Sequence, residues 1–186
     1  EPHETVATGE TILALRDVTA IGEKGVPALK QVSLEIQAGE TLGIAGVAGN
    51  GQSELAEVVT GLRRTTAGTI HVAGKEVTNR PAGEITRAGV AHVPEDRLAT
   101  GLIGGMDLSA NAILRDYDQP PLAQGPFLSG GAVASFTDSL IDRHDVKAPG
   151  RWARLRTLSG GNQQKLLLGR ELNGAPRLIV AVHPTR

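Results

Sequence analysis

The chain has 186 residues, with 19 basic and 20 acidic side chains and a formal net charge of −1. This near-neutral balance gives no broad positive surface for nucleic acid, so a nucleic-acid partner is not expected. Cysteine is absent, which excludes disulfides, thiolate catalysis and thiolate metal sites. No apolar run approaches the roughly 18 to 20 residues that span a bilayer, and no signal-peptide pattern is recognised. Any membrane role would therefore go through a partner.

The two ends of the sequence predict a piece of a longer polypeptide. Residues 1–10 are polar and contain a proline and a glycine, as is typical of a linker. Residues 178–182 are apolar and predict a buried strand, although only four residues follow. Further strands would be needed to cover this side of the sheet. Without them we expect exposed apolar surface, with marginal stability or self-association.

Apolar periodicity in the first half of the chain predicts alternating strands and helices. We expect strands over residues 10–17 and 31–37 with a turn at 22–25, an apolar strand over 41–45, a helix over 53–62, a hairpin over 69–72 and 75–78, a helix over 82–88 and a strand over 89–93. A glycine-rich loop lies between the strand over 41–45 and the helix over 53–62. Strand, glycine loop and helix is the order that phosphate binding requires.

The composition changes from residue 97 to about residue 156. All four aromatic residues lie in this stretch, namely Tyr117, Phe127, Phe136 and Trp152. Residues 135–144 have helical periodicity, and the proline- and glycine-containing residues 119–127 predict a loop. We therefore expect an inserted, mainly helical subdomain, followed by a helix over 158–172 and the strand over 178–182.

The glycine loop has the layout of a phosphate cradle. Its candidate nucleotide-binding residues are Gly46, Gly49, Asn50, Gly51, Gln52, Ser53 and Glu54. The glycines let backbone N–H groups point at phosphate oxygens, the following helix adds its positive N-terminal dipole, and Ser53 occupies the position of a magnesium-binding hydroxyl. Position 52, where this pattern has lysine, is glutamine. A neutral amide donates a hydrogen bond but cannot neutralise phosphate charge, so nucleotide would bind more weakly.

Two other interpretations of the loop stay open. It could be a glycine-rich turn without a ligand, because three glycines alone are a weak signal. A dinucleotide-binding pattern fits less well, since its last glycine would fall on Glu54 or its second on Ala48.

A second glycine element opens the helix predicted over residues 158–172. Residues 158–165 read Leu-Ser-Gly-Gly-Asn-Gln-Gln-Lys. Ser159, Gly160 and Gly161 would place a hydroxyl and free N–H groups at a helix start, which can bind an anion but can also be only a good N-cap. The longer string, with a phosphate-binding loop upstream and an apolar strand ending in His-Pro-Thr downstream, resembles the ABC ATPases. The Asn-Gln-Gln-Lys extension looks like their carbohydrate and nucleoside importer branch.

More of the chain supports the resemblance to this branch. Residues 43–55, 93–97 and 184–186 are similar to the second, C-terminal nucleotide-binding domain of tandem-domain sugar or nucleoside importers. The resemblance runs from about residue 11 to residue 186 and implies an α/β P-loop NTPase fold of ABC type, with an antiparallel β subdomain and an inserted helical subdomain. The implied domains are a linker (1–10), a P-loop ATPase core with the β subdomain (11–96 and 157–186) and the helical subdomain (97–156).

The sequence departs from the working ATPases of this family at four positions. The Walker A lysine aligns with Gln52, and the Q-loop glutamine aligns with Glu95, which could approach a metal, repel a phosphate or form a surface pair with Arg97. The Walker B aspartate and glutamate align with Val182 and His183. The adenine-stacking aromatic residue is also missing. Losing the lysine and both carboxylates removes most of what the protein supplies to phosphoryl transfer, so little hydrolysis is expected here.

The resemblance implies a role within a larger assembly. ATP is the expected cofactor, and magnesium has weak support from Ser53 alone. In such transporters two nucleotide-binding domains pack head to tail, so Ser159, Gly160, Gly161 and Gln163 would complete the competent site of the partner domain in trans. Transmembrane permease subunits would contact the segment from Glu95 to Asn111, solute would arrive through a separate binding protein, and the chain would lie peripherally on the cytoplasmic face of the inner or plasma membrane.

Two competing functions remain. A self-sufficient ATPase could use Gln52 and His183 in place of the usual groups, because imidazole titrates near neutral pH and can act as a base. A soluble ABC protein of repair or translation is disfavoured by the Asn-Gln-Gln-Lys extension and by the absence of excess positive charge.

Overall fold

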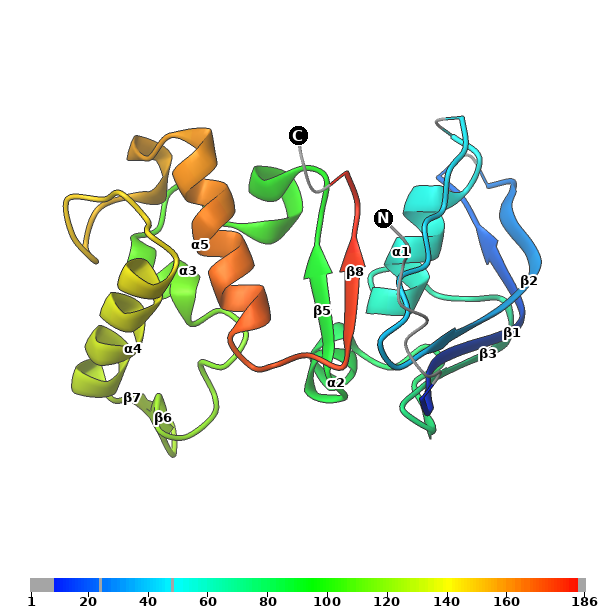
Figure 1. Cartoon of the computed structure of the whole chain (residues 1–186), viewed down its shortest axis with the longest axis horizontal. Coiled ribbons are helices and arrows are strands. Elements are labelled where there is room, and N and C mark those ends of the chain that lie inside the picture. The colour runs from blue at the N-terminus through cyan, green and yellow to red at the C-terminus, as the bar shows by residue number, and fades with distance from the viewer. Residues whose placement is uncertain (1–8, 24, 48, 184–186) are drawn as a thin grey trace, which may run out of the picture. The chain divides into compact units, whose positions relative to one another are not determined.

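The computed structural model describes residues 9–23, 25–47 and 49–183. The chain divides into two compact units (Figure 1). The first unit comprises Glu1–His92 and Pro176–Val182, and the second comprises Val93–Ala175 and His183–Arg186. The domain boundaries drawn from the sequence stay predictions, as does the expected linker over residues 1–10.

An antiparallel sheet forms the larger part of the first unit. Its strands are β1 (Thr11–Ile21), β2 (Pro27–Gln37), β3 (Ala67–Val72) and β4 (Lys75–Glu76), in the order β2-β1-β3-β4. Leu15 lies opposite Leu34 on β2 and Ile70 on β3, and Leu15 is fully buried. The alternation of apolar and polar residues thus directs one face of the sheet into a core, and the expected strands and hairpin are confirmed.

The pairing of β1 with β3 depends on Gly68. This residue has a φ of +86°, and a Cβ atom there would overlap the backbone of Asp17 and the carbonyl oxygen of Arg16. Only glycine combines this left-handed conformation with such a close approach of two strands. The register of β1 against β3 shifts beyond Arg16, next to this contact.

Two helices and two short strands complete the first unit. These elements are α1 (Gln52–Thr60), α2 (Ala82–Arg87), β5 (Val90–Val93) and β8 (Leu178–Ala181). β5 and β8 are hydrogen-bonded neighbours and run in the same direction (Figure 1). Val58 and Val59 of α1 join the core beneath the sheet, and α1 contacts β8. The helices predicted over 53–62 and 82–88 and the strands predicted over 89–93 and 178–182 are confirmed to within a few residues. The expected burial of the last strand is wrong, because only Leu178 of β8 is buried and Ile179 is 51% exposed.

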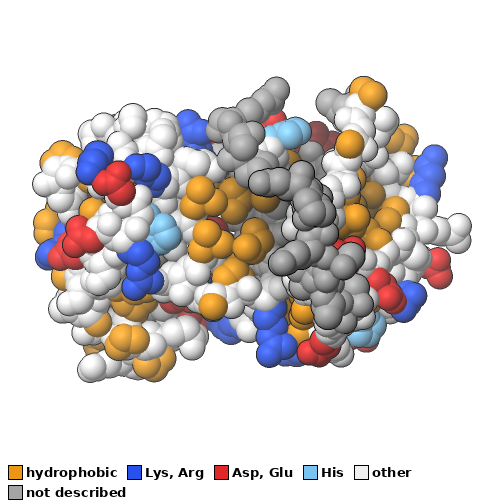
Figure 2. All heavy atoms as spheres, viewed as in Figure 1, with side chains coloured by type: hydrophobic (Ala, Val, Ile, Leu, Met, Phe, Trp, Pro, Cys, Tyr) orange, Lys and Arg blue, Asp and Glu red, His pale blue; other side chains and the backbone are white. Residues whose placement is uncertain are grey.

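The strand expected over residues 41–45 is wrong. These residues have no regular secondary structure and are exposed, with Leu42 at 42% and Ile44 at 54% of full exposure. An apolar run forms a strand only where a neighbour completes its hydrogen-bond ladder, and residues 41–45 pair with none of the described strands. Figure 2 shows hydrophobic side chains reaching the surface in this view of the molecule.

The second unit is mainly helical. Its elements are η1 (Arg97–Gly101, a π-helical turn), α3 (Leu108–Ala112), β6 (Ala123–Gln124), β7 (Phe127–Leu128), α4 (Gly130–Arg143), η2 (Leu155–Thr157) and α5 (Gly160–Leu172). Buried leucines from α3, α4, η2 and α5 form its core: Leu108, Leu140, Leu155, Leu166 and Leu167. The helices predicted over 135–144 and 158–172 are confirmed. The turns η1 and η2, α3 and the β6–β7 hairpin lacked a clear periodic signal.

A buried charged cluster joins α5 to its neighbours. Arg170 and Glu171 are 6% and 5% exposed, and Glu171 binds both Arg170 (2.9 Å) and Arg115 (2.7 Å). Arg170 also donates to the carbonyl oxygens of Gly101 (2.8 Å) and Asn111 (3.3 Å). Burial lowers the pKa of Arg170, and the nearby Glu171 carboxylate partly offsets this lowering.

Across the described ranges, every helix is too short or too polar to cross a membrane.

Candidate functional site

The N-terminus of α1 is fixed against the start of β2. Gly51, the N-cap of α1, has a φ of +96°, and a Cβ atom there would lie 2.7 Å from the carbonyl oxygen of Ala28 and 3.2 Å from Leu29 Cδ2. Glu54 in the first turn of α1 points toward the turn after β1, with Oε1 3.4 Å from the position of a Cβ on Gly22. The backbone of the glycine loop therefore ends at a helix N-terminus that the sheet holds in place.

Gln52 folds back over the glycine loop. Its Nε2 donates a long hydrogen bond to the carbonyl oxygen of Val47 (3.4 Å), and a Cβ on Gly46 would overlap the same amide nitrogen. Gly49 has a φ of +88°, a conformation suited to glycine. The amide at position 52 thus lies along the loop, where it can donate a hydrogen bond but brings no charge.

The start of α1 is suited to an anion, although the strand that the phosphate-binding order requires before the glycine loop is not formed. The first N–H groups of α1 lack partners within the helix, so they are available to an anion. Glu54 is the charged residue of the first turn and is acidic, while Asn50 and Ser53 are exposed. Ala48 lies outside the described residues. Among residues 9–23, 25–47 and 49–183, no three His, Asp or Glu side chains come together as a metal site.

Val182 and His183 follow β8 directly. Val182 is half-buried, whereas His183 is 62% exposed and has a φ of +46°. His183 Nδ1 lies 3.1 Å from Oε1 of Glu95, which precedes η1. The residues aligned with the catalytic glutamate and the Q-loop glutamine therefore form a pair with each other in the second unit, and an open depression lined by residues 95–98 lies beside Glu95.

The signature residues Ser159, Gly160 and Gly161 form the N-terminus of α5. Ser159 is the N-cap, and its Oγ accepts hydrogen bonds from the backbone N–H of Asn162 (3.4 Å) and from Asn162 Nδ2 (3.0 Å). Ser159 and Gly161 are exposed, and a Cβ on Gly161 would meet nothing within 4 Å. This end of α5 consequently presents a hydroxyl and free N–H groups to an open space.

Gln163 faces the interior instead. It is 6% exposed, and its Nε2 donates to the carbonyl oxygens of Leu155 (3.3 Å) and Leu158 (3.1 Å). Its Oε1 accepts from Arg97 Nε at 3.2 Å. Of the four predicted signature residues, Gln163 is therefore turned into the unit, where it binds the turn before α5 and Arg97.

A second Leu-Ser-Gly-Gly sequence, which the sequence motifs described above do not include, occurs in the chain. Residues 128–131 repeat residues 158–161, and they also open a helix, α4. Here Ser129 makes no side-chain capping hydrogen bond, whereas Ser159 does. The tetrapeptide alone is therefore not specific, and the residues packed behind it distinguish the two helix starts.

Comparison with known families agrees with this arrangement of a glycine loop, a Ser-Gly-Gly helix start and an antiparallel β subdomain. The family described as ABC transporter matches residues 29–186. The chain belongs to the ABC transporter family of ATP-binding domains. This result confirms the P-loop, ABC-type fold expected from the sequence.

The curated relatives of this chain include proteins named as import ATP-binding proteins. It is 42% identical over 178 residues to the guanosine import ATP-binding protein NupO of Bacillus subtilis, covering 96% of this chain and 35% of that protein. It is 41% identical to the glucose import ATP-binding protein TsgD13 of Haloferax volcanii, covering 99% of this chain and 34% of that protein. The chain thus spans about a third of the length of these relatives.

Solved structures support the fold. A dimeric ATP-binding cassette in a post-hydrolysis state, bound to ADP and Pi, superposes with a TM-score of 0.74 and 24% identity, covering 94% of this chain and 75% of that chain. A nucleotide-free ATP-binding cassette from an ABC transporter gives a TM-score of 0.70 at 20% identity, covering 95% of this chain and 70% of that chain.

Proposed function

We propose that this chain is the second, C-terminal ATP-binding domain of a tandem ATPase subunit in an importer of sugars or nucleosides. Its glycine loop binds ATP weakly and hydrolyses little. Its signature residues, Ser159, Gly160 and Gly161, complete the competent site of the partner domain in trans. The assignment to import is supported by relatives named for the import of guanosine and glucose, of which this chain corresponds to about a third.

The observation that carries the proposal is the contrast between the two glycine elements. At α5, an exposed Ser159 hydroxyl and an unobstructed Gly161 stand at a helix N-terminus. At α1, the position for a charged lysine holds the neutral amide of Gln52, which rests on Gly46 and Val47. One element is suited to complete another site, and the other is suited to hold nucleotide without promoting its cleavage.

Weak hydrolysis follows from the groups that replace the catalytic ones. Phosphoryl transfer depends on positioning and on neutralising charge at the phosphates. Gln52 supplies no charge, Val182 supplies no carboxylate for a metal ion, and His183 is directed at Glu95. Magnesium, when bound, would neutralise phosphate charge, and Ser53 is the residue that would hold it.

The proposed partners are the second nucleotide-binding domain, the transmembrane permease subunits and a separate solute-binding protein, and no nucleic acid is involved. Apolar side chains within the segment from Glu95 to Asn111 support its assignment to the permease contact, because Leu98, Ile103 and Met106 are 48%, 43% and 42% exposed. Such contacts would hold the chain on the cytoplasmic face of the inner or plasma membrane.

A valine at Gly161 tests the role in trans. In the full-length subunit assembled with its permease, Gly161→Val is expected to lower ATP hydrolysis about 100-fold or more, because the side chain occupies the space in which a phosphate would meet the helix N-terminus. The repeated tetrapeptide provides a matched control: Gly131 is the second residue of α4 as Gly161 is of α5, and a Cβ there also meets nothing within 4 Å. Normal hydrolysis in Gly161→Val would refute the proposal, whereas Gly131→Val should remain active.

A second candidate function, a self-sufficient ATPase with His183 as base, is favoured by one contact. Oε1 of Glu95 lies 3.1 Å from His183 Nδ1 and orients the imidazole ring. Under this alternative, His183→Ala would abolish magnesium-dependent phosphate release by the purified chain. Under the proposed function that release is already minimal, and the substitution changes nothing.

A further inference from the structure

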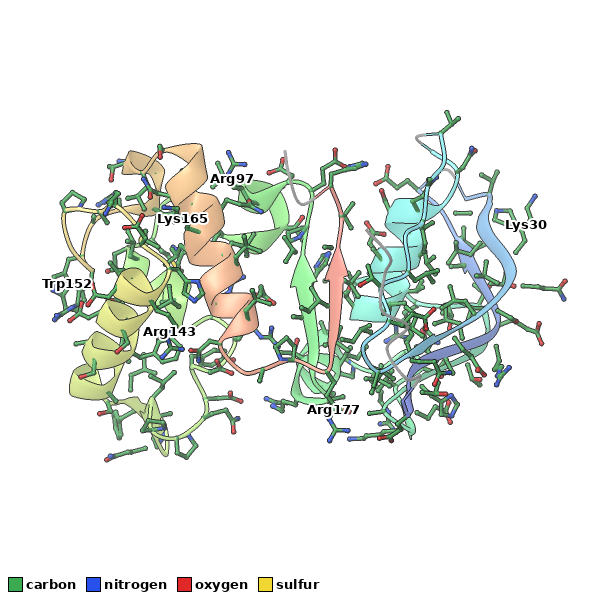
Figure 3. All side chains as sticks on the ribbon, viewed as in Figure 1. Lys30, Arg97, Arg143, Trp152, Lys165 and Arg177 are labelled. Carbon is green, nitrogen blue, oxygen red and sulfur yellow. The ribbon has the colours of Figure 1, made fainter. Side chains whose placement is uncertain are left out.

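Arg97 packs a guanidinium group against the first residue of the signature helix. Its Nε donates to Gln163 Oε1 at 3.2 Å, and its Nη2 lies 2.6 Å from the position that a Cβ would occupy on Gly160. A Cβ at Gly160 would displace the guanidinium from this position. Figure 3 labels Arg97 beside α5.

The hydrogen bonds of Gln163 connect Arg97 to the turn before α5. Because the amide NH₂ group donates to the carbonyl oxygens of Leu155 and Leu158, the amide oxygen must face Arg97. Leu158 directly precedes the N-cap Ser159. The orientation of the Gln163 amide, and through it the turn that carries Ser159, therefore depends on a donor from η1.

The start of α4 shows what the same tetrapeptide lacks without such support. A Cβ on either Gly130 or Gly131 would meet nothing within 4 Å, and Ser129 makes no side-chain capping hydrogen bond. At α5 the corresponding glycine, Gly160, contacts Arg97, and the Ser159 side chain caps the helix by accepting from Asn162 N–H. The difference lies in side chains that come from outside the tetrapeptide.

The C-terminal end of η1 also contacts α5. Arg170 Nη2 donates to the carbonyl oxygen of Gly101 at 2.8 Å. A Cβ on Gly101 would lie 3.2 Å from a methyl carbon of Leu167, so backbone and helix are in close contact. With Arg97 at one end and Gly101 at the other, η1 and α5 are expected to move together.

We propose that Arg97 is a positioning residue for the signature element. Through Gln163 it holds the turn over residues 158–161 so that Ser159 and the N–H groups of Gly160 and Gly161 face the terminal phosphate bound by the partner domain. It also couples any displacement of η1 to that turn. This inference rests on the proposed function, in which the signature acts in trans.

The test measures the kcat and KM of ATP hydrolysis in the full-length subunit assembled with its permease. Arg97→Gln should lower kcat about 10- to 100-fold, because misplacing groups near the reacting atoms by about an ångström costs a loss of this order, while KM stays within about twofold. Arg97→Lys keeps a donor and a charge and should recover most of the activity. In a Gln163→Leu background, Arg97→Gln should have little additional effect, because Arg97 acts through Gln163.

Arg143→Gln is the matched control. Arg143 also donates to an amide oxygen, that of Asn173 (3.3 Å), in the same unit but at an exposed position, so its loss should leave kcat unchanged. An unchanged kcat in Arg97→Gln, or a loss of kcat that Arg97→Lys does not restore, overturns this inference. If Gly161→Val still loses its ATP hydrolysis in that case, the proposed function stands. If Gly161→Val remains active, the proposed function fails and this inference fails with it.

Discussion

Restoring a lysine at position 52 should strengthen nucleotide binding without creating an active ATPase. In the structure the Gln52 amide donates only a 3.4 Å hydrogen bond to Val47, so little is lost when it is replaced. A charged hydrogen bond contributes about 1.5–3 kcal/mol and a neutral one about 1 kcal/mol. The gain of about 0.5–2 kcal/mol corresponds to binding that is about 2- to 30-fold tighter.

The assay is a titration of labelled ATP into the purified chain, with and without magnesium. Gln124→Lys is the control for net charge, since Gln124 is exposed on β6 in the other unit. Without nucleotide, Gln52→Lys should be slightly less stable, because it places a cation at the N-terminus of α1. Equal affinity for the native chain and Gln52→Lys, or an equal gain in Gln124→Lys, would refute the role assigned to the glycine loop.

Two further predictions concern the second unit. Glu171→Gln should lower the free energy of unfolding by about 3–5 kcal/mol, because it removes the carboxylate that Arg170 and Arg115 share. Urea denaturation measures this change, and an unchanged midpoint of the unfolding transition would show that the cluster is not stabilising. Lys147 and Lys165 lower the pKa of Asp145, so this carboxylate contributes stability above its unfolded pKa and loses it as the pH falls through the lower folded value. Asp145→Asn should therefore reduce stability slightly at pH 7 and not at all at a pH well below the folded pKa of Asp145, as measured by thermal unfolding, and an equal loss at both pH values would contradict this sign.

The sequence was most informative where a side-chain pattern is set by local burial. Alternation over residues 10–17 and 31–37 predicted the strands that are β1 and β2, whereas the antiparallel β subdomain was implied by the family resemblance. The Ser-Gly-Gly sequence over residues 159–161 predicted the start of the helix that is α5. The motif over residues 158–165 identified the family, which neither pattern could do.

Tertiary contacts decided the features that the sequence did not predict. The apolar run at residues 41–45 looks like a strand, but strand formation requires a pairing partner that periodicity does not reveal. The contact between Glu95 and His183 and the support of Gly160 by Arg97 join residues far apart in the chain. Local propensity carries no information about such pairs, so for Glu95 the sequence offered a metal contact, repulsion of a phosphate or a surface pair with Arg97.

The most direct test of the central claim is the release of inorganic phosphate from ATP by the purified chain in the presence of magnesium. Gly49 and Gly51 of the glycine loop have positive φ angles, but Gln52, Val182 and His183 stand where the family resemblance places charged groups. We predict turnover far below about 1 s⁻¹, the lower end of typical enzymes. Rapid, magnesium-dependent phosphate release at or above that rate would contradict the account.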